Sequence, residues 1–480
     1  MQGFSGAPGR EGPPADVPPA GLRKIWTWGA LIALGGFLLG FDTGVISGAL
    51  LFIRPEFGLS PVQQGGVVSV LVLGALAGAP ASRRLADRFG RRRALEAEGL
   101  VFLAGTVIAV FSPGYGTLLA GRLVLGLAVG AASATVPVYL SEIAPKDLRG
   151  RLLTLNQLMI ALGVLVAYLV ALAFSGSGDW RAMIAVGAIP GFAMVAAAVL
   201  VLPESGPWLL EHGRRDRARE VIASVTGPAS ADRLIERYER RTGEEAARRG
   251  PGETGARALR EARLRPALAV GLALAALQQF AGINTVFYYA PTIIERTGLT
   301  ASHAISYAIA IGVVNLLMTL VAVRAVERAG RRPLMLGSLA VMTVAMVLLG
   351  LSFAADWPSE VALAFMVVYI AGYAAGLGPV FWTLIGEIFP ARARAAGSDA
   401  SAAVNRASNV AVSLAFLPIA GAIGQGGTFW IFAAVSLLGL LFVVRCVPET
   451  EHRDPASIDA DLRRRFERRP PDAAAGGRPG

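Results

Sequence analysis

The chain alternates between apolar stretches of about twenty residues and short polar segments. A helix rises ~1.5 Å per residue, so ~20 apolar residues cross a hydrocarbon layer of ~30 Å. The first stretch, from Gly29 to Ile53, is long enough for this. The pattern predicts an all-α membrane protein with twelve transmembrane helices, over residues 28–52, 63–82, 94–112, 116–140, 152–174, 181–202, 266–290, 304–326, 333–354, 360–386, 396–420 and 427–447.

Basic residues follow every second apolar stretch, whereas segments 175–180 and 355–359 contain no Lys or Arg. Because Lys and Arg favour the cytoplasmic side, both termini are expected in the cytoplasm. Arg outnumbers Lys and Ala is abundant, which is typical of a GC-rich bacterium. We therefore expect a multi-pass protein of the bacterial cytoplasmic (inner) membrane, with basic cytoplasmic clusters at Ser82–Arg93, Pro145–Arg151, Arg324–Arg332 and Arg392–Arg394.

One long charged segment, residues 203–264, divides the apolar stretches six and six. It is too charged to lie in a membrane, and pairs such as Glu236 and Arg240 predict short amphipathic helices in the cytoplasm. The domains expected are a disordered tail 1–25, a six-helix bundle 26–202, a cytoplasmic linker 203–264, a second six-helix bundle 265–450 and a tail 451–480.

Two short motifs occur once in each half of the chain. Leu85–Arg92 resembles Val326–Arg332, and Ser141–Pro145 resembles Gly386–Pro390. In both cases the copies are separated by about half the chain length. Transporters with two parallel repeats bind their substrate near the membrane midplane, between the repeats. The repeat therefore predicts two similar bundles with a binding site at their interface.

The composition agrees with a membrane protein and excludes several other classes. Hydrophobic residues make up 54%, charged residues 16%, and the mean hydropathy is +0.55, whereas soluble domains carry about 25% charged residues. The net charge of +11 lies mostly in loops and tails, so nucleic acid is not an expected partner. The single cysteine, Cys446, excludes an internal disulfide framework, and no metal-ligand spacing is present. With no nucleophile–base set or phosphate-binding loop, we expect neither an enzyme nor a cofactor.

The first apolar stretch carries an acid and the fourth an arginine. A charged side chain at membrane depth costs at least ~2.5 kcal/mol, so Asp42 and Arg122 need a reason to be there. One interpretation is that Asp42 caps a helix or faces a buried loop, and that Arg122 extends to the interface. The interpretation that we favour is a buried pair at a proton or cation site, because each charge compensates the other. Protonation of Asp42 would then act as an electrostatic switch.

The seventh stretch holds the densest polar group, in residues 278–291. Amide side chains both donate and accept hydrogen bonds, which suits the hydroxyls of a neutral sugar or polyol. Trp382 offers an apolar face on which a pyranose ring could stack. The alternative is hydrogen bonding between helices, worth ~0.6 kcal/mol each. The candidate substrate-binding residues are Gln157, Gln278, Gln279, Asn284, Tyr288, Asn315, Trp382 and Asn405.

The charged loop residues have two interpretations. They act as orientation signals alone, or they form salt-bridge latches that are intact in an outward-open state and broken in an inward-open state. The candidate gate residues are Asp87, Arg91, Glu142, Arg149 and Glu204, with the second-half residues Glu327, Arg331, Glu387 and Arg394.

From about residue 28 to 455, the chain resembles the sugar porter family of the major facilitator superfamily. The segments that carry the resemblance are GFDTGVISGAL (40–50), DRFGRR (87–92), GRLVLGLAVG (121–130), YLSEIAPKDLRG (139–150), PESGPWLL (203–210), QQFAGINTVFYYAP (278–291), ERAGRRP (327–333), GPVFW (378–382), EIFP (387–390) and VPET (447–450). The resemblance implies twelve helices in two bundles, alternating access, and sugar contacts at Gln157, Gln278, Gln279, Asn284, Asn315 and Trp382.

The resemblance also bears on mechanism. An aspartate at position 42 resembles the proton-coupled members, whereas passive members commonly have Asn there. The family's PESPRWL motif reads PESGPWLL here, Val164 replaces a glutamine of some symporters, and Arg406 replaces the Trp of many hexose members. We therefore expect a monomeric importer of a neutral monosaccharide or polyol, driven by proton symport, in the lipid bilayer. The alternatives are a passive facilitator and a transporter-like sugar sensor; the sequence does not distinguish pentose, hexose and polyol.

Overall fold

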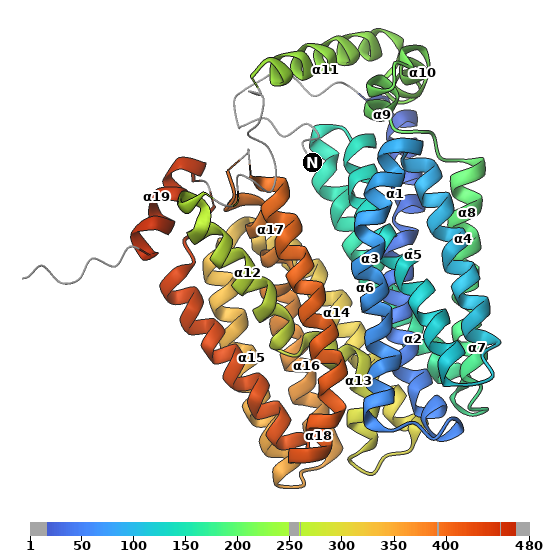
Figure 1. Cartoon of the computed structure of the whole chain (residues 1–480), viewed down its shortest axis with the longest axis vertical. Coiled ribbons are helices and arrows are strands. Elements are labelled where there is room, and N and C mark those ends of the chain that lie inside the picture. Colours follow the sequence, from blue (N-terminus) through green and yellow to red (C-terminus); the bar gives the residue numbers. More distant parts are fainter. Residues whose placement is uncertain (1–16, 249–258, 260, 391–392, 452, 467–480) are drawn as a thin grey trace, which may run out of the picture.

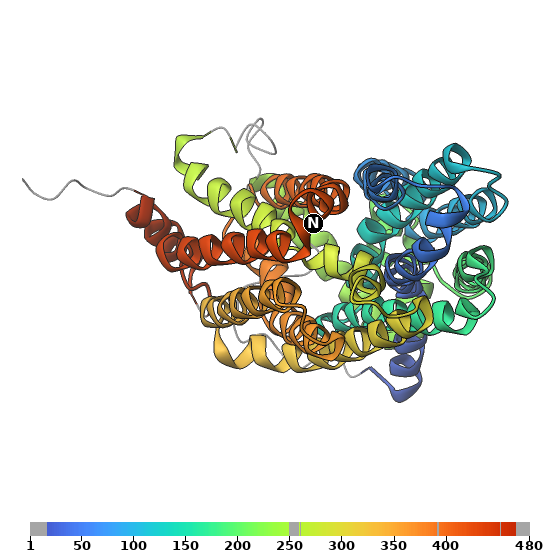
Figure 2. The same cartoon turned by 90° about the horizontal axis from the view of Figure 1, so that it is seen from below.

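The computed structural model describes residues 17–248, 259, 261–390, 393–451 and 453–466, and these residues form helices and no strands. The helices form two bundles that lie side by side in both views (Figures 1 and 2). The first bundle contains α1 (Pro19–Ile32), α2 (Leu34–Glu56), α3 (Pro61–Phe89), α4 (Arg91–Val110), α5 (Tyr115–Ile143), α6 (Lys146–Ser175), α7 (Trp180–Ala185) and α8 (Ala188–Leu200).

The second bundle follows after the linker. It contains α12 (Arg265–Phe280), α13 (Ile283–Glu295), α14 (Ala301–Ala329), α15 (Arg331–Ala354), α16 (Ser359–Ala375), α17 (Leu377–Glu387) and α18 (Arg394–Cys446). The linker forms α9 (Gly206–Glu211), α10 (Arg215–Thr226) and α11 (Pro228–Arg248), and α19 (Pro455–Phe466) follows the second bundle. The linker helices and α19 lie at one end of the bundles (Figure 1).

In the described part of the chain, ten helical stretches are long and apolar enough to cross a membrane. The sequence pattern predicts twelve, and the difference lies in two places. The stretch at 94–112 is α4, which begins with three arginines and carries two acids, Glu96 and Glu98. The stretches at 396–420 and 427–447 both lie in α18, which has 53 residues and a non-helical backbone at Gly424 (φ 77°).

The ends of the described chain are more ordered than the tails expected from composition. Residues 19–25 belong to α1, and Lys24 donates a hydrogen bond to the backbone of Ser224 in α10. At the other end, α19 is amphipathic: Ile458 and Leu462, four residues apart, are both buried. This apolar face is the physical reason why part of 451–480 packs against the protein. Residues 1–16 and 467–480 lie outside the described residues.

Glycines let α3 and α5 approach closely. A Cβ atom on Gly126 would lie 2.1 Å from the carbonyl oxygen of Leu71, and one on Gly130 would lie 2.3 Å from that of Ala75. Neither glycine could carry a side chain without separating the two backbones. The contact between α3 and α5 therefore falls at two glycines that are four residues apart.

The two bundles meet along three helix pairs: α3 with α18, α6 with α14, and α2 with α13. A hydrogen bond also joins α6 to α13, because the Tyr168 hydroxyl donates to the carbonyl of Phe287. One close approach within the named pairs is between α3 and α18. A Cβ atom on Gly65 of α3 would lie 2.7 Å from the carbonyl oxygen of Leu414 of α18.

Candidate functional site

The structure places Asp42 and Arg122 in direct contact. Asp42 lies on α2 and Arg122 on α5, and Nη1 of Arg122 donates to Oδ1 of Asp42 at 2.6 Å. Both residues are buried, with exposed fractions of 2% and 1%. Nε of Arg122 also donates to the carbonyl of Val67 at 3.2 Å, which holds the guanidinium in place. The second oxygen of Asp42, Oδ2, has no hydrogen-bond partner among the described residues.

The backbone around Asp42 explains why the acid sits so deep. Gly40 and Gly44 flank it and face α6, where Cβ atoms would lie 1.9 Å from the carbonyl oxygen of Ile160 and 2.8 Å from that of Val164. Helix α2 therefore packs its backbone directly on α6, and Asp42 is carried into the interior between α2 and α5.

Tyr288 connects this pair with the second bundle. It lies on α13, is buried, and lies near both Asp42 and Arg122. Nδ2 of Asn409 on α18 lies 3.5 Å from the Tyr288 hydroxyl, and Ser413 donates to Oδ1 of Asn409 at 2.9 Å. The buried pair of the first bundle is thus adjacent to a chain of polar side chains in the second.

Four of the candidate amide residues form one connected cluster. Asn405 on α18 is at its centre: its Nδ2 donates to Oε1 of Gln278 at 2.7 Å, and its Oδ1 accepts from Gln279 at 3.0 Å. Asn284 donates to Oε1 of Gln279 at 2.7 Å. The left-handed backbone of Gly282 (φ 94°) separates α12 from α13, so Gln279 and Asn284 meet although five residues apart.

The remaining candidate binding residues lie outside this cluster. Gln157 is exposed on α6, Asn315 is half-buried on α14, and Trp382 on α17 is 49% exposed. Among the described residues, their side chains make no hydrogen bond to the amide cluster. The structure therefore groups Gln278, Gln279, Asn284 and Asn405 in one cluster and places Tyr288 near Asp42. The remaining candidates, Gln157, Asn315 and Trp382, lie on three separate helices.

Sequence reasoning missed two polar residues at this site. Asn409 and Ser413 lie on α18 at four-residue steps from Asn405, which places all three on one face of the helix. That spacing is the signal that could have identified them. Arg406, noted in the sequence as a departure, reaches the first bundle instead: it donates to the carbonyl of Ala75 at 2.9 Å and to Oγ of Ser133 at 2.6 Å.

Most of the candidate gate residues from the first half of the chain contact one another. Arg91 on α4 pairs with Glu142 on α5 at 3.0 Å and with Asp87 at 3.3 Å. Glu204 accepts hydrogen bonds from the backbone N–H groups of Arg91 (2.8 Å) and Arg92 (3.3 Å). Arg149 lies half-buried at the start of α6.

The second bundle repeats this arrangement. Arg331 on α15 pairs with Glu387 at 3.3 Å and with Glu451 at 3.0 Å. Glu449 accepts from the backbone N–H groups of Arg331 (3.1 Å) and Arg332 (3.0 Å), as Glu204 does in the first bundle. Sequence reasoning missed Glu449 and Glu451 as partners, although VPET parallels the PES motif around Glu204. Arg394 donates to the carbonyl of Phe389, and the side chain of Glu327 lies outside those described.

Two further ion pairs join the bundles to each other. Arg83, near the C-terminal end of α3, pairs with Asp399, near the start of α18, at 2.6 Å. Arg54 pairs with Glu295 of α13 at 3.2 Å, and it lies at the opposite end of the bundle, because it is near the end of α2, where α3 begins. No group of metal-ligating side chains that could hold an ion is found in the described part of the chain.

Comparison with known proteins agrees with this architecture. The family model for "Sugar (and other) transporter" matches residues 28–462. The D-xylose transporter of Levilactobacillus brevis is 40% identical over 452 residues, covering 92% of this chain and 97% of that protein. The galactose-proton symporter of Escherichia coli (strain K12) is 36% identical over 437 residues, covering 90% and 93%.

Solved structures show the same fold. The inward-open xylose transporter XylE from E. coli aligns with a TM-score of 0.79 at 28% identity, covering 91% of this chain and 99% of that one. The XylE structure bound to 6-bromo-6-deoxy-D-glucose aligns with a TM-score of 0.73 at 27% identity, covering 92% and 100%. Members of this family are transporters rather than enzymes. The chain therefore belongs to the sugar porter family of the major facilitator superfamily.

Proposed function

We propose that this protein imports a neutral monosaccharide or polyol by proton symport. The observation that carries the proposal is the buried Asp42–Arg122 contact of 2.6 Å, with one carboxylate oxygen unpartnered. A carboxylate in this position can take up a proton, whereas arginine keeps its charge. The galactose-proton symporter, 36% identical to this chain, supports the same assignment.

Coupling follows from the electrostatics of this pair. A proton on Asp42 removes one charge of the pair and weakens its hold on Arg122. Because Tyr288 of the second bundle lies near both residues, this change also alters the electrostatic surroundings of a side chain in the other bundle. One proton moving through ~100 mV is worth ~2.3 kcal/mol, which sustains roughly fortyfold accumulation of a sugar.

The amide cluster provides the sugar-recognition chemistry. In the structure its amides bond to each other, so Gln278, Gln279 and Asn405 are satisfied without a ligand. Sugar hydroxyls donate and accept in the same way and can replace these bonds at small net cost. Gln157, Asn315 and the exposed face of Trp382 would complete the site from three other helices.

Alternating access requires contacts that open at one end while others close. The pairs Arg83–Asp399 and Arg54–Glu295 occupy opposite ends of the bundle interface and suit this role. The networks around Arg91 and Arg331 would stabilise the cytoplasmic ends of the bundles. We place twelve crossings in the bacterial cytoplasmic membrane, counting α4 and both halves of α18, with both termini cytoplasmic and the monomer as functional unit.

The test is a pH measurement on weakly buffered, de-energised cells that express the protein. Xylose, arabinose, glucose, galactose, inositol and sorbitol are added in turn, and external alkalinisation is recorded. We expect alkalinisation with at least one sugar, and its loss in Asp42→Asn. The matched control is Asp356→Asn, which changes an exposed acid in the loop between α15 and α16 and should leave the signal intact.

The other outcomes separate the alternatives. A flat pH trace with labelled sugar still equilibrating across the membrane would overturn symport and leave a passive facilitator. Binding of a sugar to the purified protein without any uptake would indicate a sensor.

A further inference from the structure

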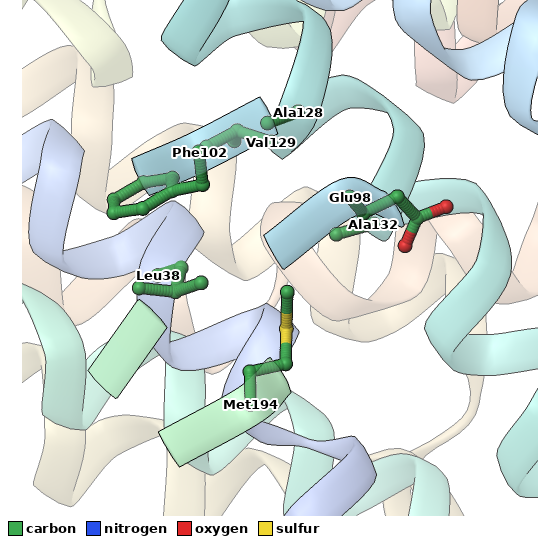
Figure 3. A pocket seen from close by; sticks show the side chains of 7 residues that line it. All are labelled: Leu38, Glu98, Phe102, Ala128, Val129, Ala132 and Met194. Atoms are coloured by element: carbon green, nitrogen blue, oxygen red, sulfur yellow. The ribbon is translucent and has the colours of Figure 1, made fainter. Parts of the chain in front are cut away.

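A second buried carboxyl lies in the first bundle, apart from the Asp42–Arg122 pair. Glu98 on α4 is 3% exposed. Figure 3 shows Glu98 among the residues that line a gap, with Leu38, Phe102, Ala128, Val129, Ala132 and Met194, and its carboxyl group pointing away from Leu38 and Phe102. The gap is apolar and has no room for a water molecule. An acid in such surroundings is costly when charged, so its protonation state needs an explanation.

Three oxygen atoms meet at Glu98. Its Oε1 lies 2.6 Å from Oγ of Ser82 on α3 and 2.5 Å from Oγ1 of Thr135 on α5. The two hydroxyl oxygens are themselves 2.5 Å apart. The three atoms therefore form a closed triangle that connects three helices of the first bundle.

The triangle has a definite proton requirement. Each of its three oxygen–oxygen contacts is a hydrogen bond only if one proton lies between the two atoms. Ser82 and Thr135 carry one hydroxyl proton each and so supply two of the three. An ionised Glu98 has none to give, whereas a neutral Glu98 supplies the third. The neutral acid is therefore the form that satisfies all three contacts.

The charged groups around Glu98 also favour the neutral acid. No basic side chain lies within ion-pair distance of Glu98 among the described residues, and the buried Arg122 is held by Asp42. The second oxygen, Oε2, has no hydrogen-bond partner there either. An ionised Glu98 would thus leave a buried, charged oxygen without a hydrogen-bond partner. A buried acid without a neighbouring cation takes up a proton instead.

We propose that Glu98 is a second proton-binding site, which holds a resident proton as a neutral acid and links α3, α4 and α5. All three helices belong to the first bundle, so movement of one bundle against the other does not change the contacts of Glu98 with Ser82 and Thr135. The proton at Glu98 is therefore not the transported one. This assignment is independent of the sugar and of the role proposed for Asp42.

Infrared spectroscopy tests the proposal, because the carbonyl stretch of a neutral carboxylic acid is separate from the carboxylate bands. Purified wild-type protein, Glu98→Gln and Asp42→Asn would be compared, with the carboxyl carbons of glutamate isotopically labelled. We expect a label-shifted neutral-acid band in the wild type and in Asp42→Asn, and its loss in Glu98→Gln. Sugar-induced alkalinisation should persist in Glu98→Gln, which separates this result from the symport test.

A second variant keeps the proposal testable if Glu98→Gln does not fold. Ser82→Ala removes one hydroxyl from the triangle, and the neutral-acid band should shift in frequency while remaining present. A wild-type spectrum with only carboxylate bands of labelled glutamate would overturn the proposal. So would a neutral band that persists in Glu98→Gln or that does not respond to Ser82→Ala.

Discussion

Arg83 at the end of α3 and Asp399 near the start of α18 form an ion pair of 2.6 Å between the two bundles. The two residues are 316 positions apart, and both side chains are about half exposed. Since an exposed pair contributes ~0.2–1 kcal/mol, it shifts the balance between closed and open states by up to about fivefold.

We predict that Asp399→Arg opens the bundle interface at the end that holds this pair and that the exchanged pair, Arg83→Asp with Asp399→Arg, closes it again. The measurement is the labelling rate of a cysteine at Gln157, in a Cys446→Ser background, by an impermeant maleimide added to inside-out vesicles. Arg84→Ala, at the exposed neighbour of Arg83, should leave the rate unchanged. Equal rates in the single and exchanged variants would contradict a latch function.

The buried pair should respond asymmetrically to loss of either partner. Asp42→Ala leaves Arg122 buried and charged, because arginine cannot lose its proton, and we expect a loss of ~3–5 kcal/mol. Arg122→Ala leaves Asp42, which becomes neutral by binding a proton, so the loss should be smaller. Unfolding of both variants by denaturant in detergent measures the difference. A larger loss for Arg122→Ala would show that Asp42 is stabilised in its charged form by other groups.

Asn405 should dominate sugar affinity among the amide residues. Asn405→Ala removes its bonds to Gln278, Gln279 and the carbonyl of Ala275, and leaves buried polar atoms unsatisfied. Leaving buried polar atoms unsatisfied costs ~1–3 kcal/mol, so the sugar affinity should fall roughly 5- to 150-fold. Equilibrium binding to purified protein measures this.

The control for Asn405 is Thr343→Ala on α15. Its hydroxyl bonds to the carbonyl of Leu339 within the same helix, so affinity should stay at the wild-type value. If Asn405→Ala binds as tightly as this control, the amide cluster holds helices together rather than recognising sugar.

Glu449 should make stability depend on pH in the acidic range. Burial raises the pKa of its carboxyl, but hydrogen bonds from the backbone N–H groups of Glu451, Arg332, Thr450 and Arg331 outweigh burial and lower the pKa below the ordinary 4.5. The folded pKa is therefore the lower one, so the stabilisation is complete above pH 4.5 and is lost as the pH falls through the folded value.

Thermal unfolding at a series of pH values tests this statement. Glu449→Gln should unfold at a lower temperature than the wild type near neutral pH, and the two should converge on acidification. The exposed Asp454→Asn serves as control and should follow the wild type throughout. If the difference in unfolding temperature between wild type and Glu449→Gln grows on acidification, the pKa of Glu449 is not lowered in the folded protein.

Much of the fold was predictable because it depends on local patterns. Length and hydropathy of each stretch predict the helices, and the repeated motifs predict two similar bundles. The predicted pair of Asp42 and Arg122 forms a contact, since two opposite buried charges in one bundle have few other partners.

Other features escaped sequence reasoning for physical reasons. Helix α4 was predicted as the apolar stretch 94–112, but the three arginines before that stretch belong to the same helix, which packs in the bundle through Ala94, Leu95 and Phe102. The amphipathic α19 looked like a tail because its apolar face consists mainly of Ile458 and Leu462. In a segment as short as α19, two buried apolar side chains are enough to hold the helix against the protein although its average composition is polar.

The sequence by itself determined which segments are apolar, which family the motifs resemble, and which polar residues lie in membrane stretches. The tertiary structure alone decided which of those residues meet. Arg406 reaches Ser133 rather than its neighbours, and Glu98 meets Ser82 and Thr135. These contacts depend on the rotation and depth of each packed helix. Packing of the whole bundle sets both quantities, and no local pattern encodes them.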